Sequence, residues 1–345
     1  MKKEYLRHAV IELTSDCNLR CKHCYNWWKQ AGVRAERYNS YRKAFTLLDY
    51  LIRKTTLERV VFSGGEPTIG ERFEELVLHA KVNGLSVTVI TNGNGDPAIY
   101  ERLVALKVDL VELSILSFRP EVHDAITGVR GSWEKTMATL RFLLEKGLKV
   151  VPVMVVTRAN YLDVEKCVEE LFRMGIRGFM VNRYNIGGEG LNQEKSLSVG
   201  KEELREVFAK VDALAERFGL HVTSGVCTPY CLLDAGNYPH VRFGSCSTEV
   251  YRRPLTFDIA GNIRMCNHSP RVVGNIYRQT LSEILFSDYA CSWADVEAAD
   301  CRGCLKWSVC RGGCRAAAEQ MGNTLDRVDP IVKELSLKPF LNTLL

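Results

Sequence analysis

Six short runs rich in β-branched residues alternate with longer amphipathic segments between residues 8 and 190. The short runs predict strands at Ala9–Leu13, Arg59–Phe62, Ser86–Ile90, Leu110–Ile115, Val150–Val156 and Phe179–Val181. The longer segments predict helices at Arg42–Lys54, Arg72–Asn83, Ala98–Ala105, Trp133–Glu145 and Val164–Met174. Because strands that alternate with helices at this spacing are usually parallel, we predict an α/β fold, either a partial (β/α) barrel or an open sheet. In both folds the chemistry lies at the carboxyl ends of the strands.

Some boundaries of these elements follow from capping residues. Ser132 is expected to cap the helix that carries Trp133, and Gly147 lies just past the end of that helix. A glycine-containing stretch at 184–200 is predicted to be a loop. The apolar spacing that follows it predicts a packing helix at Lys201–Phe218.

The thirteen cysteines are the most unusual feature of the composition. Their number is odd, many are closely spaced, and no signal peptide precedes them. We therefore expect metal or cluster binding in a reducing cytoplasm rather than a disulfide framework. The net charge of +5 is spread along the chain and gives no case for nucleic-acid binding. The chain has no run of 18 apolar residues, so no membrane span is expected.

Three cysteines, Cys17, Cys21 and Cys24, stand just after the first predicted strand with the spacing C-x3-C-x2-C. Three thiolates at this spacing can wrap around one ion or one corner of a cluster. A [4Fe–4S] cluster normally takes four cysteines, so three would leave one iron open to a small molecule. The alternative is a zinc site or a set of redox thiols, with His23 between two of the cysteines.

The spacing C-x3-C-x2-C after a first strand resembles the signature of the radical S-adenosylmethionine (SAM) enzymes. The resemblance implies a core built as a partial (β/α)6 TIM-like barrel. In it, Cys17, Cys21 and Cys24 would hold the catalytic [4Fe–4S] cluster, and the amino and carboxylate groups of SAM would bind the fourth iron. His23 and Tyr25, which flank the third cysteine, would lie near the adenine.

Residues after the later strands resemble the SAM-contacting positions of the same family. Gly64-Gly65-Glu66 follows the second strand, as the GGE motif of the family does. Its glycines would let the backbone approach the ligand, and a carbonyl or the carboxylate would accept from the SAM ammonium. The other candidate contacts are Thr91, Asn92, Ser114, Ser117, Arg130 and Asn182. The usual Asp-Gly pair of the family is absent near Ser117, and Arg130 is either a partner of the SAM carboxylate or a solvated charge.

A second cysteine pattern near the C-terminus reads Cys246-x14-Gly261-x4-Cys266, then Cys301-x2-Cys304-x5-Cys310-x3-Cys314. Taken alone, this pattern is also typical of zinc ribbons or knuckles. Beside a radical SAM core it resembles the SPASM module, which holds two auxiliary [4Fe–4S] clusters. We therefore predict a radical SAM core at 1–190, a bridging loop and helix at 191–225, a SPASM module at 226–325 and a C-terminal segment at 326–345.

The SPASM resemblance sorts these cysteines into two ligand sets. It assigns the first auxiliary cluster to Cys246, Cys266 and Cys314, and the second to Cys301, Cys304 and Cys310. The fourth ligand of the first cluster would be Cys227 or Cys231, and the spare one of the two would be a thiol hydrogen donor. The second cluster lacks its usual downstream cysteine, and its last position is left to Cys291, Glu319, Asp326, Asp329 or an open iron. Cys167 is expected to be a buried structural residue.

The resemblance also implies a reaction. An electron from a flavodoxin or ferredoxin would reach the first cluster, SAM would be cleaved to methionine and a 5′-deoxyadenosyl radical, and this radical would abstract a substrate hydrogen. Enzymes with this two-module layout mostly modify peptides or proteins, so we expect crosslinking, oxidation or epimerisation of a ribosomally made peptide. Because the first strand begins near residue 9, we expect peptide recognition by the core, by the second module or by a separate partner protein.

Three alternatives to peptide modification stay open. They are oxidative decarboxylation of a haem precursor, a sulfatase-maturase-like protein oxidation, and an iron–sulfur or zinc scaffold without enzymatic activity. Incubation with porphyrin substrates would separate the first, and metal analysis would separate the last.

Overall fold

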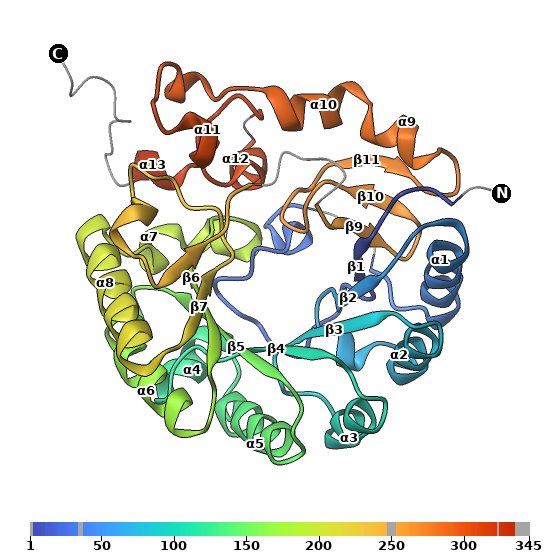
Figure 1. Cartoon of the computed structure of the whole chain (residues 1–345), viewed down its shortest axis with the longest axis horizontal. Coiled ribbons are helices and arrows are strands. Elements are labelled where there is room, and N and C mark those ends of the chain that lie inside the picture. Colours follow the sequence, from blue (N-terminus) through green and yellow to red (C-terminus); the bar gives the residue numbers. More distant parts are fainter. Residues whose placement is uncertain (1–2, 34–36, 247–252, 323, 335–345) are drawn as a thin grey trace.

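A sheet of eleven strands runs through the residues that the computed structural model describes, which are 3–33, 37–246, 253–322 and 324–334. The sheet curves into an open barrel with helices on its convex side (Figure 1). Its strand order is β11-β10-β9-β1-β2-β3-β4-β5-β6-β7-β8. The predicted α/β fold with a partial barrel is confirmed.

The first six strands are parallel neighbours, and one or more helices join each to the next. The strands are β1 His8–Glu12, β2 Arg59–Ser63, β3 Ser86–Thr91, β4 Leu110–Ser114, β5 Val150–Val156 and β6 Gly178–Arg183. The helices are α1 Tyr41–Lys54, α2 Phe73–Val82, α3 Pro97–Ala105, α4 Pro120–Thr127, α5 Ser132–Glu145 and α6 Val164–Arg173. The six predicted strands and five predicted helices are all present, and their ends differ from the prediction by at most two residues.

Helix α4 is absent from the sequence prediction, and it changes how α5 begins. Ser132 is the first residue of α5 rather than its cap. The carboxylate of Asp124, in α4, accepts from the backbone N–H of Trp133 at 2.8 Å and from that of Gly131 at 2.6 Å. The prediction of Ser132 as the cap was therefore wrong, because the preceding helix supplies the capping carboxylate.

Two more parallel strands extend the sheet beyond β6. They are β7 (His221–Ser224) and β8 (Val241–Phe243). The predicted loop at 184–200 contains a 3-10 helix at Gly188–Gln193 and the single turn α7 at Glu194–Leu197. Helix α8 (Lys201–Phe218) has its predicted bounds and packs against α6.

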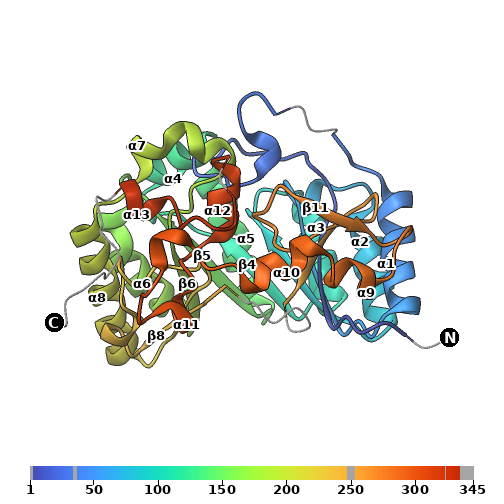
Figure 2. The same ribbon diagram turned by 90° about the horizontal axis from the view of Figure 1, so that it is seen from above.

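The C-terminal region completes the opposite edge of the sheet. Strand β9 (Leu255–Asp258) pairs in parallel with β1, and β10 (Asn262–Arg264) and β11 (Val272–Asn275) follow as antiparallel strands. The helices after them are α9 Leu281–Leu285, α10 Asp288–Asp295, α11 Trp307–Cys310, α12 Arg315–Gln320 and α13 Ile331–Glu334. Together these helices span the open side of the barrel (Figures 1 and 2).

The sheet therefore crosses the module boundaries predicted at residues 190 and 225. Both outer edges of the sheet, β8 and β11, belong to the predicted SPASM module, β7 belongs to the predicted bridging region, and the middle of the sheet belongs to the predicted core. The division into modules stays a prediction, and residues 335–345 of the predicted C-terminal segment lie outside the described residues.

The two faces of each core strand differ in what they contact. On β1, Ile11 is fully buried in the core beneath the helices, and on β4 the same holds for Val111 and Leu113. Since side chains alternate along a strand, Glu12 and Glu112 face the concave side of the sheet. The loops that follow the strands gather at one rim of the barrel, where the candidate site lies.

Candidate functional site

The loop that follows β1 carries the three cysteines of the first motif at the rim of the barrel. Burial raises the pKa of Cys21, and the neighbouring thiols of Cys24 and Cys17 raise it further. Burial lowers the pKa of Lys29, but the charges of Cys24, Cys17 and Cys21 outweigh this and raise it. The cation therefore acts electrostatically on all three thiols of the loop.

An open cavity of about 940 Å³ adjoins this loop. Cys17 and Cys21 line it, together with Lys29, Trp28 and Arg37. The donor set and the space fit a cluster held at the cavity wall, where a second molecule can reach it. Four cationic residues and two carboxylates line the cavity, so its net positive charge would favour an anionic group in that molecule.

The two glycines of the second motif bring their loop against the cysteine loop. The backbone N–H of Gly65 donates to the carbonyl of Thr14 at 2.6 Å. A Cβ atom at Gly65 would stand 1.9 Å from the carbonyl oxygen of Asp16, and one at Gly64, where φ is +134°, would stand 2.4 Å from that of Thr14. In this structure the glycines permit the approach of protein backbone to protein backbone.

Glu66 joins the loops after β2 and β3. Its buried carboxylate accepts from the hydroxyl of Thr91 at 2.7 Å and the backbone N–H of Asn92 at 2.8 Å. It also accepts from the hydroxyl of Thr68 at 2.7 Å and the backbone N–H of the same residue at 3.2 Å. These protein donors hold the carboxylate between the two loops, and the expected contact of the motif with the SAM ammonium stays a prediction.

The turn after β3 reaches the cysteine loop directly. The side-chain amide of Asn92 donates to the side-chain oxygen of Asn18 at 2.8 Å and lies 3.8 Å from the Cys17 sulfur. The carboxyl ends of β1, β2 and β3 therefore form one connected site, as the strand order requires.

Other predicted contacts hold protein segments together. Ser117 is buried and donates to the Asp163 carboxylate at 2.7 Å. The side-chain oxygen of Asn182 accepts from the backbone N–H of Gly225 at 2.7 Å. Ser114 is half-buried at the end of β4, and Arg130 is exposed in the turn between α4 and α5. The end of α4 packs on the cysteine loop, since the backbone N–H of Arg20 donates to the Thr127 carbonyl at 2.9 Å. The contact expected for Arg130 stays a prediction.

The two residues that flank Cys24 point in different directions. Burial, aided by the neighbouring His123, lowers the pKa of His23 to about 4, so its imidazole is neutral. The hydroxyl of Tyr25 accepts from the side-chain amide of Asn267 at 2.9 Å, and its ring lies 3.7 Å from the ring of His268. Tyr25 therefore joins the cysteine loop to the C-terminal region, which the sequence did not indicate.

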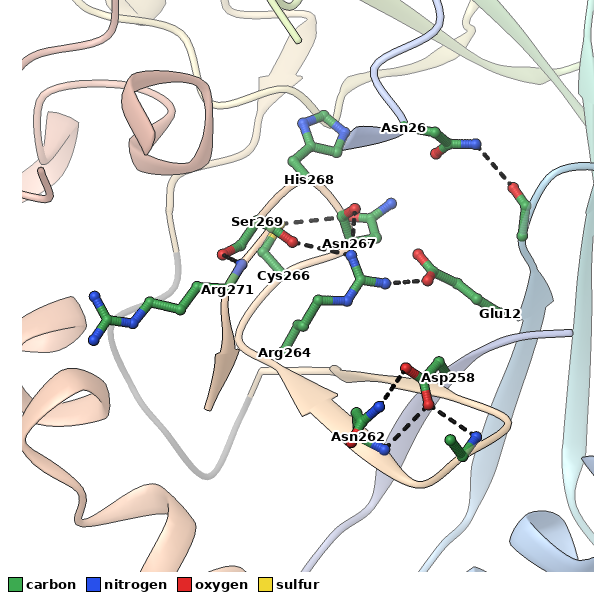
Figure 3. Close-up of polar contacts among 12 residues, drawn as sticks. Glu12, Asn26, Asp258, Asn262, Arg264, Cys266, Asn267, His268, Ser269 and Arg271 are labelled. Carbon is green, nitrogen blue, oxygen red and sulfur yellow. Dashed lines mark hydrogen bonds and ion pairs between the residues drawn. The ribbon is translucent and has the colours of Figure 1, made fainter. Parts of the chain in front are cut away.

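A second junction between the first strand and the C-terminal region lies near Cys266 (Figure 3). Arg264, on β10, and Glu12, on β1, point toward one another and form a buried ion pair. Arg264 also donates to the carbonyl of Ser269 at 3.0 Å. The junction fixes the segment that carries Cys266 on the strand that precedes Cys17. The sequence signal that could have indicated this pair is the presence of Glu12 and Arg264 within otherwise apolar strand patterns.

Eight cysteines of the C-terminal half form two groups. The first group is Cys227, Cys246, Cys266 and Cys314. The Cys227 thiol donates to Cys246, and the charges of Cys314 and Cys266 also raise the pKa of Cys227. The second group is Cys231, Cys301, Cys304 and Cys310, which together line one small cavity. All thirteen cysteines lie in the described residues, and none of them forms a disulfide.

The remaining candidate ligands belong to neither group, although the Asp329 carboxylate lies beside Cys314. Cys291 is exposed on α10, and Cys167 is buried in α6 as predicted. Asp329 pairs with Arg183, and Glu319 accepts from Ser269 at 2.8 Å. The described residues include no group of three or more His, Cys, Asp or Glu side chains arranged around a single metal ion. Asp326 is exposed.

None of the helices in the described residues has both the length and the apolar composition needed to cross a membrane.

Residues 11–171 match the family model of the radical SAM superfamily. The PqqA peptide cyclase of Xanthomonas campestris pv. campestris (strain B100) is 25% identical over 336 residues, which cover 94% of this chain and 85% of the relative. The mycofactocin maturase MftC of Mycolicibacterium smegmatis is 29% identical over 338 residues, which cover 92% of this chain and 80% of the relative.

Two solved structures are similar to the chain over most of its length. Streptococcus suis SuiB bound to S-adenosylmethionine has a TM-score of 0.72 at 17% identity, over 95% of this chain and 77% of that one. The anSMEcpe structure with bound AdoMet has a TM-score of 0.72 at 17% identity, over 96% of this chain and 91% of that one. These likenesses show a shared fold that includes both the barrel and the C-terminal region.

Proposed function

Because this chain is a radical SAM enzyme with a C-terminal SPASM module, we propose that it reductively cleaves SAM and uses the 5′-deoxyadenosyl radical to abstract hydrogen from a ribosomally synthesised peptide. The observation that carries the proposal is the cysteine loop at the end of β1, locked against the Gly64-Gly65 loop and open to a large cavity. When bound, a [4Fe–4S] cluster supplies the electron for the cleavage.

The cysteines, Lys29 and Asn92 have separate roles in the proposed site. Cys17, Cys21 and Cys24 would hold the cluster, and a cluster held by three cysteines would have one iron free to bind SAM. Lys29 offsets the negative charge of three thiolates in a partly buried site. Asn92 fixes the Cys17 end of the loop through its contacts with Asn18 and the Cys17 sulfur.

A peptide is the substrate class that the relatives favour. One similar protein is a cyclase of the peptide PqqA, and a solved neighbour, SuiB, binds the precursor peptide SuiA. The substrate here would be crosslinked, oxidised or epimerised, with the auxiliary clusters accepting or carrying electrons. The peptide would be recognised by the core, by the second module or by a separate partner protein, and a flavodoxin or ferredoxin would deliver the electron. We place the reaction in the cytoplasm, because thirteen free thiols need a reducing compartment.

The test is anaerobic reconstitution with iron and sulfide, followed by SAM and dithionite. We expect 5′-deoxyadenosine from the wild-type protein and from Cys291→Ala, whose thiol is exposed and lies outside both groups. Cys17→Ala should form none. Equal 5′-deoxyadenosine from the wild type and Cys17→Ala, or zinc in place of about 12 iron atoms per chain, would refute the proposal.

A further inference from the structure

We propose that Cys231 completes the second auxiliary [4Fe–4S] site, so that both auxiliary sites are closed by four cysteines. The inference deepens the proposed function and rests on its auxiliary clusters. It assigns one cysteine of the short segment Cys227–Cys231 to each site. The second site then needs no downstream cysteine, carboxylate or open iron.

The small cavity of the second group carries the assignment. Cys231, Cys301, Cys304 and Cys310 all line it, with Tyr230 and Gly312 among the other lining residues. The backbone N–H of Tyr230 donates to the Cys310 sulfur at 3.3 Å, which holds the segment with Cys231 against the run with Cys310. The charges of Cys310 and Cys304 act on Cys231, and that of Cys231 acts on Cys301.

Cys227 belongs to the other group. Its thiol donates to Cys246, and the charges of Cys314 and Cys266 act on it. Arg183 also holds this residue, since its guanidinium donates to the Cys227 carbonyl at 2.7 Å. The three residues between Cys227 and Cys231 are therefore enough to join one group to the other.

A second short segment also joins the two cysteine groups. In the run Cys310 to Cys314, the first cysteine belongs to the second group and the last to the first group. The two segments touch at their middles, because a Cβ atom at Gly313, where φ is +82°, would stand 2.6 Å from the Pro229 ring. The two auxiliary sites thus share two crossing segments, packed so closely that glycine is required at their contact.

The competing ligands have other partners or other places. The Asp329 carboxylate forms a buried ion pair with Arg183 and accepts from the backbone N–H of Cys314 at 2.8 Å. Glu319 accepts hydrogen bonds from Ser269 and Tyr289. Cys291 is exposed on α10. A closed second site leaves no iron there for a substrate, so its role would be electron transfer.

Paired substitutions test the assignment in the background Cys17→Ala/Cys21→Ala/Cys24→Ala, which holds the auxiliary sites alone. Reconstitution of this background should give about 8 iron atoms per chain. Adding Cys231→Ala should remove about 4 iron atoms, or convert one cluster into a [3Fe–4S] form with its own electron paramagnetic resonance (EPR) signal. Cys291→Ala in the same background should change neither quantity.

Double variants then show which site Cys231 serves. Cys231→Ala with Cys304→Ala should damage a single cluster, because both ligands serve the same site. Cys231→Ala with Cys266→Ala should damage both clusters. The reverse pattern, or an unchanged iron content and EPR spectrum in Cys231→Ala, would overturn the assignment. These readouts do not depend on SAM cleavage, so they separate this inference from the failure of the proposed reaction.

Discussion

Glu12 and Arg264 stand 252 positions apart in the chain and form an ion pair with side chains only 3% exposed each. One lies at the end of β1, before the first cysteine loop, and the other at the end of β10, before Cys266 (Figure 3). The rings of Trp27 and Trp28 lie 5.9 and 6.0 Å from the guanidinium. The pair thus anchors both cysteine-bearing loops to one point of the sheet.

Breaking this pair should destabilise the protein. Arg264→Met leaves the Glu12 carboxylate buried without its cation, so we expect the free energy of unfolding to fall by about 3–5 kcal/mol. Urea denaturation followed by circular dichroism measures this change. The double variant Glu12→Met/Arg264→Met should recover most of the loss, because no buried charge is then left unpaired. Equal losses in the single and double variants would contradict this account.

A methyl group at Gly65 should separate the two loops of the site. The Cβ atom would stand 1.9 Å from the Asp16 carbonyl oxygen, so Gly65→Ala must displace the backbone before Cys17. We expect a loss of stability of at least about 3 kcal/mol and loss of 5′-deoxyadenosine formation. Gly178→Ala is the matched control, since its Cβ would meet its nearest atom at an ordinary 3.6 Å. Wild-type activity in Gly65→Ala would show that the loops can separate freely.

Glu112 should make stability depend on pH. Burial raises the pKa of this carboxyl on the concave side of the barrel. The folded state therefore holds the proton more tightly than the unfolded state, and the stability gained below the unfolded pKa is lost as pH rises through the folded pKa. Glu112→Gln should be more stable than wild type at pH 8, by about 1 kcal/mol, and no more stable at pH 4.

Thermal denaturation across this pH range measures the Glu112 effect. Glu121→Gln, on the exposed face of α4, is the control and should follow the wild-type curve. A difference between Glu112→Gln and wild type that is the same at pH 4 and pH 8 would exclude titration of Glu112 as its cause.

Arg315 should raise the reduction potential of the first auxiliary site above that of the second. It is 2% exposed, its charge acts on Cys246, and it donates to the Val296 carbonyl at 2.7 Å. The charge of Asp300 acts on Cys301 of the second group, whereas that of Asp329 acts on both groups, through Cys231 and Cys314. Since reduction adds negative charge, a buried cation favours the reduced cluster.

An EPR-monitored redox titration checks this difference. The signal lost in Cys246→Ala identifies the first site, and that signal should move to lower potential in Arg315→Gln while the other stays in place. Arg315→Lys should restore part of the shift, and Arg278→Gln, an exposed cation, should cause none. A first site with the lower potential would contradict the electrostatic argument.

The core strands could be predicted because each is a β-branched run followed by a long amphipathic segment. The C-terminal strands could not, since β10 has three residues and shows no measurable period. The prediction of the α5 cap was wrong for a related reason. The capping residue, Asp124, belongs to another helix and lies nine positions before Trp133. Local patterns therefore describe the barrel and miss the elements that tertiary contacts define.

The candidate site also has one part that the sequence could predict and one part that it could not. Spacing alone indicated Cys17, Cys21 and Cys24, because one loop carries all three. Cys227 and Cys231 join different groups because of tertiary contacts with distant parts of the chain. Their spacing of four positions does not predict which group each one joins. The occupied carboxylate of Glu66 was equally hidden, since its donors Thr91 and Asn92 come from the next strand.

The parallel pairing of β1 with β9 sets the order in which a newly made chain can mature. One edge of β1, among the first residues to leave the ribosome, has no neighbour until residues 255–258 have been synthesised. An open strand edge is prone to pair with other chains, so the growing protein needs protection over most of its synthesis. Arg264, which forms the ion pair with Glu12, is synthesised equally late. The loop that comes first in the sequence is therefore among the last parts of the enzyme to become ready for its metal.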